Sequence, residues 1–99
     1  MPKRVQNVIG SSKGKVPKDI LKCWENYTGI TQIACSVIDG DNCKGQQLNG
    51  AHVIYIDEDV NKQYIIPLCD SCNGKSPDDV LNIYDDIKRM EADKLKHYL

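Results

Sequence analysis

The chain has 99 residues, a formal net charge of −1, one Trp and no Phe. A chain of this length forms one small domain with a modest apolar core, to which a bound metal would add stability. Nothing in it approaches the ~20 consecutive apolar residues of a membrane span, and its start has no apolar signal-peptide segment, so we expect no membrane association and a cytoplasmic location.

Positive charge is concentrated near the N-terminus. Residues 1–24 carry six Lys or Arg against one acidic residue, whereas residues 25–99 carry seven against thirteen. Residues 1–15 are rich in Gly, Ser and Lys, which predicts a flexible basic arm that could contact nucleic-acid phosphates. Only two of the bases are Arg, the residue suited to bidentate phosphate and guanine contacts, so strong duplex binding by the rest of the chain is not expected. Residues 16–99 are predicted to form a single domain.

An N-terminal helix is predicted over residues 17–28. Pro17 suits the first helical position, and Gly29 suits the position after the last turn. The apolar residues that share one helical face are Ile20, Trp24 and Tyr27. Cys23 lies beside this face and has no neighbour at metal-ligand spacing, so we interpret it as a buried structural thiol.

Two strands are predicted next, in the segments "AHVIYID" (residues 51–57) and "KQYIIPLC" (residues 62–69). Both are rich in β-branched and aromatic residues. The polar segment "EDVN" joins them, which indicates a β-hairpin.

A long C-terminal helix is predicted over residues 76–99. Ser76 is a candidate N-cap, Pro77 suits the first position, and Asp79 completes a capping-box spacing. The residues that roughly share one helical face are Val80, Tyr84, Ile87, Leu95 and Tyr98. The predicted fold class is therefore α+β, with a hairpin between an N-terminal and a long C-terminal helix.

Cys69 and Cys72 form a CxxC where the second strand meets the following helix. Zinc prefers four thiolate or imidazole ligands in a tetrahedron, and a CxxC turn supplies two. Cys35 and Cys43 are the natural source of the other two, although seven residues separate them. A rival ligand set replaces Cys35 with His52, and a chain without metal is a third alternative. An odd number of cysteines without an export signal argues against a disulfide framework.

The cysteine pair, a histidine near the start of a strand, and "YIIPLCDSCNGK" leading into a helix together resemble the HNH endonuclease family. The likeness covers about residues 33–90. It implies a small zinc-stapled treble clef, built from a β-hairpin and a helix, of the kind called ββα-metal. The residues that would hold its structural zinc are Cys35, Cys43, Cys69 and Cys72.

The same resemblance carries the family's general base to His52 and one ligand of its catalytic Mg²⁺-type ion to Asn73. The family's other ion ligand falls on Ala51, and the residue that orients the base falls on Tyr64, so the catalytic motif is degenerate. His52 would then be a packed strand residue beside the zinc site. The acidic residues that could replace the missing ligand, or form a solvated turn, are Asp57, Glu58 and Asp59.

The residues support two functions. The first is a zinc-binding, HNH-like protein that has lost catalysis and binds a macromolecular partner, expected to be another protein such as a nucleic-acid enzyme. Its size and charge suit a phage or mobile-element inhibitor of a host defence nuclease, such as an anti-CRISPR protein. The alternative is a metal-dependent HNH endonuclease that cleaves DNA, with His52 as general base. A zinc finger that binds nucleic acid without chemistry is disfavoured by the scarcity of Arg and the acidic C-terminal half.

Overall fold

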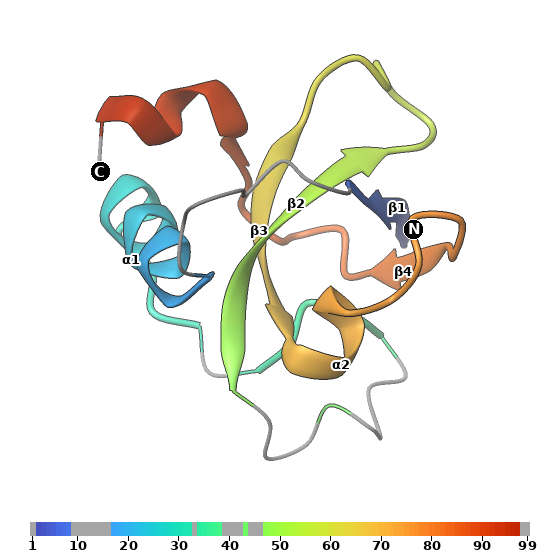
Figure 1. Cartoon of the computed structure of the whole chain (residues 1–99), viewed down its shortest axis with the longest axis horizontal. Helices are drawn as coiled ribbons and strands as arrows, with labels where there is room; N and C mark the ends of the chain where they lie inside the picture. The colour runs from blue at the N-terminus through green and yellow to red at the C-terminus, as the bar shows by residue number, and fades with distance from the viewer. Residues whose placement is uncertain (1, 9–16, 33, 39–42, 44–46, 98–99) are drawn as a thin grey trace.

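The computed structural model describes residues 2–8, 17–32, 34–38, 43 and 47–97. Within these residues lies an antiparallel sheet of five strands in the order β4-β1-β2-β3-β5 (Figure 1). The strands are β1 (Lys3–Asn7), β2 (Leu48–Tyr55), β3 (Tyr64–Cys69), β4 (Leu81–Ile83) and β5 (Met90–Glu91). The helices are α1 (Pro17–Thr28), the four-residue α2 (Asp70–Asn73) and a 3-10 helix, η2 (Ala92–His97). Figure 1 shows α1 and η2 on one side of the β2–β3 pair, and β1, β4 and α2 on the other.

The predicted hairpin is confirmed as β2 and β3, which pair antiparallel from Leu48 opposite Cys69 to Val53 opposite Tyr64. All six residues of β3 are buried. A strand that is buried throughout must be covered on both faces of the sheet, so this hairpin separates two apolar cores.

One face, the cysteine face, packs apolar side chains of β1, β2, β3 and β4 against the cysteines. Its core residues include Val5, Val53, Tyr55, Ile66, Leu68, Leu81 and Ile83. The opposite face, the helix face, packs Ile65 and Met90 of the sheet against Ile20 and Trp24 of α1 and Leu95 of η2.

The predicted N-terminal helix is confirmed as α1, with the predicted bounds. Gly29 has a φ of 73°, the left-handed conformation that glycine adopts readily after a last helical turn. Cys23 is 3% exposed within the helix-face core, as expected of a structural thiol. Tyr27 is 40% exposed, however, so the buried face of the helix runs through Cys23 rather than Tyr27.

The prediction of a flexible arm over residues 1–15 is wrong for residues 3–7, because they form β1 between β2 and β4. The rest of the described arm is Pro2 and Val8, and residues 9–15 lie outside the described part of the chain. Val5 is fully buried, whereas the adjacent charged residues are neutralised by partners: Arg4 pairs with Asp57 and Lys3 with Glu58. A strand with a single apolar residue gives almost no sequence signal.

The prediction of a long C-terminal helix over residues 76–99 is also wrong, since the described part, up to residue 97, contains β4, β5 and η2. The helical pattern required Val80 and Tyr84 in the core, yet they are 47% and 50% exposed, while Leu81 and Ile83 are buried. This alternation is the two-residue period of a strand.

Val5→Ala should lower the free energy of unfolding by about 2 kcal/mol, because it removes buried methyl groups from the cysteine face. The neighbouring Gln6 is half-buried and points the other way, and its Nε2 donates a long, solvent-exposed hydrogen bond of 3.4 Å to Asp78 O. Gln6→Ala should therefore change the stability much less than Val5→Ala. Urea unfolding of the two variants tests the placement of β1. Equal stability of both variants would mean that this segment is an arm after all.

Gly50→Ala should destabilise the packing of α1 on β2. A Cβ at Gly50 would lie 2.6 Å from both Ile20 Cγ2 and the backbone nitrogen of Leu21, and such overpacking costs about 2 kcal/mol. At Gly74 the nearest atom to an added Cβ is Asp70 O at 3.3 Å, so Gly74→Ala is the milder control. An unchanged urea midpoint for Gly50→Ala would contradict this contact.

Candidate metal centre

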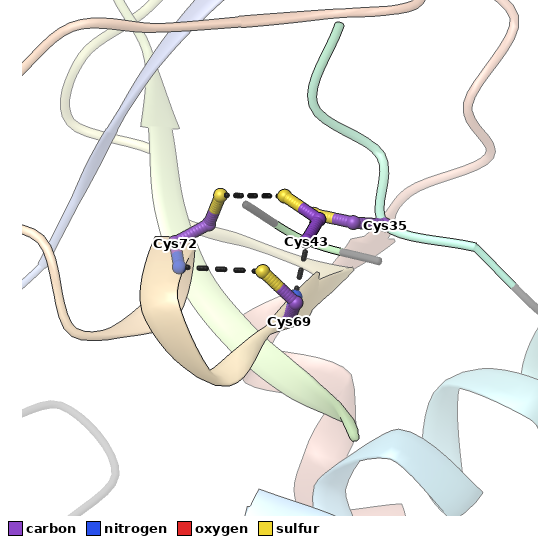
Figure 2. Close-up of side chains that lie close together, drawn as sticks. All are labelled: Cys35, Cys43, Cys69 and Cys72. Atoms are coloured by element: carbon purple, nitrogen blue, oxygen red, sulfur yellow. Dashed lines mark hydrogen bonds between the residues drawn. The ribbon is translucent and has the colours of Figure 1, made fainter. Parts of the chain in front are cut away.

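Four cysteines from three parts of the chain converge on the cysteine face (Figure 2). Cys35 and Cys43 come from the region before β2, Cys69 ends β3, and Cys72 lies in α2. Their four Sγ atoms all lie within 4.8 Å of one another. Among the described residues, no other group of three or more His, Cys, Asp or Glu is placed to share an ion. The structure thus brings together the four cysteines that the sequence selected.

The CxxC turn directs backbone N–H groups at the sulfurs. Cys69 is the N-cap of α2, and its Sγ accepts a hydrogen bond from the Cys72 N–H at 3.5 Å. The Cys69 N–H in turn donates to Cys35 Sγ at 3.3 Å, and Cys43 Sγ lies 3.4 Å from Cys72 Sγ. Donors aimed at sulfur favour thiolate, the form that binds metals.

The backbone around Cys35 is held to the sheet on both sides. The Ser36 N–H donates to Pro67 O at 3.2 Å, and Ser36 O accepts from the Tyr84 N–H at 3.1 Å. Val37 forms an isolated β-bridge with Ile83. These contacts place Cys35 beside the end of β3 although the two are far apart in sequence.

Asn7 connects β1 to the CxxC turn, a contact that the sequence did not reveal. Its Nδ2 donates to Cys72 O at 2.8 Å and to Lys75 O at 3.1 Å, and the residue is 8% exposed. On the other side of the turn, Asn49 Nδ2 donates to Asp70 Oδ1 at 2.6 Å. The two amides fix the turn from neighbouring strands, and no sequence pattern could identify Asn7 while β1 itself was missed.

The thiols differ in acidity within the cluster. Burial raises the pKa of Cys43 to about 11 and also raises the pKa of Cys72. Burial opposes ionisation of Cys69 as well, but the Cys72 N–H and the neighbouring thiols hold the pKa of Cys69 below its ordinary value. Cys69 is thus the readiest of these three to ionise, and a cation bound by all four sulfurs would displace the remaining protons.

His52 lies on the opposite face of the sheet from the cysteines. It is opposite Ile65 in the β2–β3 register, and Ile65 belongs to the helix-face core. It is 8% exposed and lines a cavity of about 420 Å³. The other lining residues are Asn61, Lys62, Gln63, Glu91, Ala92, Asp93 and Leu95.

The residues to which the resemblance assigned catalysis are therefore not brought together. Asn73 ends α2, next to Cys72 of the cysteine cluster, whereas His52 lines a cavity with residues of β5 and η2. The rival zinc set that contained His52 is not assembled either. Ala51 is buried on the cysteine face and offers no ligand atom.

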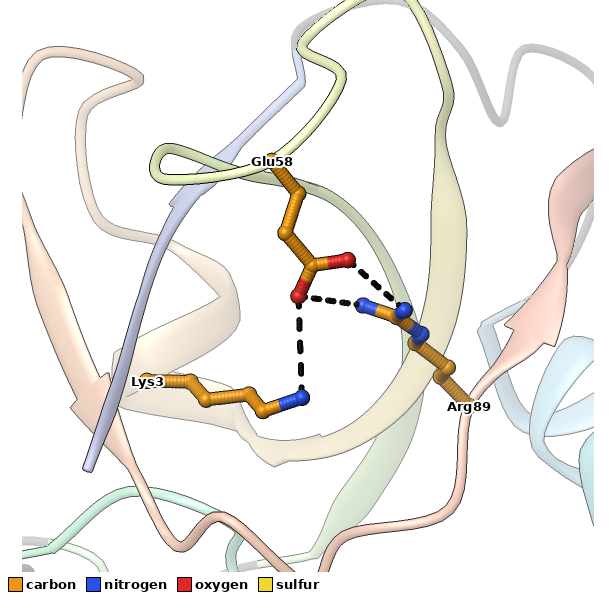
Figure 3. A network of polar contacts seen from close by, with 3 residues as sticks. All are labelled: Lys3, Glu58 and Arg89. Carbon is orange, nitrogen blue, oxygen red and sulfur yellow. Dashed lines mark hydrogen bonds and ion pairs between the residues drawn. The ribbon is translucent and has the colours of Figure 1, made fainter. Parts of the chain in front are cut away.

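The acidic residues of the hairpin turn are engaged with partners (Figure 3). Glu58 accepts two hydrogen bonds from Arg89, at 2.8 and 3.1 Å, and Lys3 Nζ lies 3.6 Å from it. The hydrogen bonds from Arg89 lower the pKa of Glu58, and Arg4 lowers the pKa of Asp57 in the same way. Asp59 Oδ1 accepts the Asn61 N–H at 3.0 Å. These contacts are those of an ion-paired turn.

No protein-family model, curated protein or solved structure matches the chain. In the described part of the chain, every helix is too short or too polar to cross a membrane.

Cys69→Ser should remove most bound metal and lower the thermal transition, because the site joins β3, α2 and the segment before β2. Metal content per chain and the melting temperature, measured after purification without chelator, test this expectation. Cys23→Ala is the matched control, since Cys23 is buried away from the cluster. Unchanged metal content and melting temperature in Cys69→Ser would eliminate the site.

Proposed function

We propose that the chain is a zinc-binding, HNH-like treble clef that has lost catalysis and acts by binding another protein. This proposal is supported by the placement of His52 opposite Ile65 of the helix-face core, whereas Asn73 follows Cys72 of the cysteine-face core. A general base and an ion ligand must reach the same phosphodiester, so their placement beside different cores favours a non-catalytic role.

The ligand set supports zinc. Four thiolates form a closed, soft, tetrahedral environment, which is typical of structural zinc sites and leaves no open position for substrate. Zn–S distances of about 2.3 Å place tetrahedral sulfurs about 3.8 Å apart, so the observed sulfurs, within 4.8 Å of one another, need little movement to close on an ion.

The order of the elements supports a treble clef. A cysteine-bearing segment precedes the β2–β3 hairpin, and the CxxC follows at the start of α2. That helix has four residues, so the metal and the two asparagines beside the turn would hold the turn in place of a longer helix.

The charges favour a protein partner over nucleic acid. Lys3 and Arg4, the described bases of the predicted arm, are paired with Glu58 and Asp57. Residues 25–99 carry thirteen acids against seven bases, which repels phosphates. The more specific expectation, a phage-type inhibitor of a host defence nuclease such as an anti-CRISPR protein, stays a prediction.

The folded, zinc-loaded protein should not nick supercoiled plasmid in Mg²⁺, Mn²⁺ or Ni²⁺. The measurement is the rate of conversion to open circles, with His52→Ala and His97→Ala run in parallel. His97 is exposed at the end of η2 and serves as the matched histidine control. Nicking that His52→Ala abolishes and His97→Ala retains would instead establish the HNH endonuclease alternative.

A further inference from the structure

One half of the helix face is left uncovered by the described residues. Helix α1 packs against β2, β3 and β5, at the other end of the sheet. In β1 and β4 the buried side chains Val5, Leu81 and Ile83 belong to the cysteine face, so their sequence neighbours point the opposite way. These neighbours, with the residues on either side of β4, define the open face: Arg4, Gln6, Val80, Asn82 and Tyr84.

The open face carries exposed apolar side chains in a regular arrangement. Val80 is 47% exposed and Tyr84 is 50% exposed, and Asn82 lies between them. Val80, Asn82 and Tyr84 thus form a row of alternate side chains, in which Val80 and Tyr84 lie just outside the two ends of β4. Single exposed apolar residues are common on surfaces, but two that share an uncovered sheet face and flank one polar residue offer a pair of anchors to an extended partner.

Acidic residues flank this row at both ends. The stretch reads "DDVLNIYDD" over residues 78–86, and all four of its aspartates are exposed. A hydrogen bond from the N-terminal amine lowers the pKa of Asp85, so Asp78, Asp79 and Asp86 contribute most of the negative charge. Arg4, the cation of the open face, makes hydrogen bonds of 2.6 and 3.0 Å to Asp57. The open face thus combines two exposed apolar side chains with a negative rim.

The outer edge of β4 is already occupied, which restricts how a partner could dock. The Ile38 N–H donates to Asn82 O at 2.8 Å, and the Tyr84 N–H donates to Ser36 O at 3.1 Å. Val37 bridges Ile83. A partner would therefore contact the side chains of the open face rather than extend the sheet beyond β4.

We propose that the open face is the docking surface for a basic protein segment in which Lys or Arg flank exposed aliphatic side chains. The inference rests on the proposed binding function and names the chemistry of the partner. A second copy of this chain would bring its own aspartates against these, and a nucleic acid would bring phosphates, so like charges disfavour both. A basic segment with apolar side chains matches the row and its rim together.

A synthetic peptide with a central run of Val and Ser flanked by pairs of Lys (the Lys–Val peptide) is the probe, with the same peptide carrying Glu in place of Lys (the Glu–Val peptide) and a DNA duplex for comparison. Titration calorimetry gives the affinities, and amide chemical shifts locate the binding site. The Lys–Val peptide should bind and shift the amides of residues 80–86. Tyr84→Ser and Asp79→Lys should each weaken binding about ten-fold.

Matched controls lie elsewhere on the surface. Tyr27→Ser removes a tyrosine of similar exposure from α1, and Asp93→Lys reverses a charge on η2; neither should alter the affinity. Failure of the Lys–Val peptide to bind, equal binding of the Glu–Val peptide or DNA, equal losses in the controls, or dimerisation dependent on Tyr84 would each overturn the docking surface. His52-dependent plasmid nicking would overturn the proposed function instead, so the two failures are distinguishable.

Discussion

Burial of the β2–β3 hairpin on both faces is the constraint on which the other elements depend. Because β3 exposes none of its residues, each face needs its own cover. Helix α1 can approach closely on one side because Gly50 has no Cβ to meet Ile20. On the other side there is no long helix among the described residues, and the described cover consists of α2, residues 34–38, Cys43 and the connection between β4 and β5. Arg89 in that connection lies 4.3 Å from the ring centres of both Tyr55 and Tyr64.

A metal bound by the four cysteines would stabilise the cysteine face, where apolar packing contributes least. The chain has no Phe, and the described part of the cysteine-face cover has little regular secondary structure. Short segments of this kind lose conformational entropy on ordering without burying much surface. One ion that joins Cys35, Cys43, Cys69 and Cys72 would link three such segments at once, and its binding free energy would count directly toward folding. The amide of Asn7 extends this link to β1.

The elements that could be predicted are those whose signals are local. Pro17 and Gly29 delimit α1, two strand-like runs around a polar turn give the hairpin, and a CxxC with two upstream cysteines gives the cluster. The C-terminal region could not be predicted in this way, because its apolar residues fit a helical and a strand period alike, and pairing with β1 decides between them. Ser76 does accept a backbone hydrogen bond, from the Asp78 N–H to its Oγ at 3.2 Å, but it does so in a turn rather than at the start of a helix. The HNH-like motif does not show which face of β2 packs against α1. The side of the sheet on which His52 lies could therefore not be predicted.

The place of β1 in the sheet also constrains how the chain can fold. Val5 pairs with both Tyr55 and Leu81, and Lys3 pairs with Ile83. The strand β1 therefore gains its second pairing partner, β4, from a segment more than 70 residues later in the sequence. Contacts of such high sequence separation form slowly, because a long loop must close before they contribute any stability. During synthesis, residues 3–7 therefore have no complete partner until β4 has left the ribosome. The β2–β3 hairpin and its CxxC turn, by contrast, are local enough to assemble first and to serve as the template on which both ends of the chain later dock.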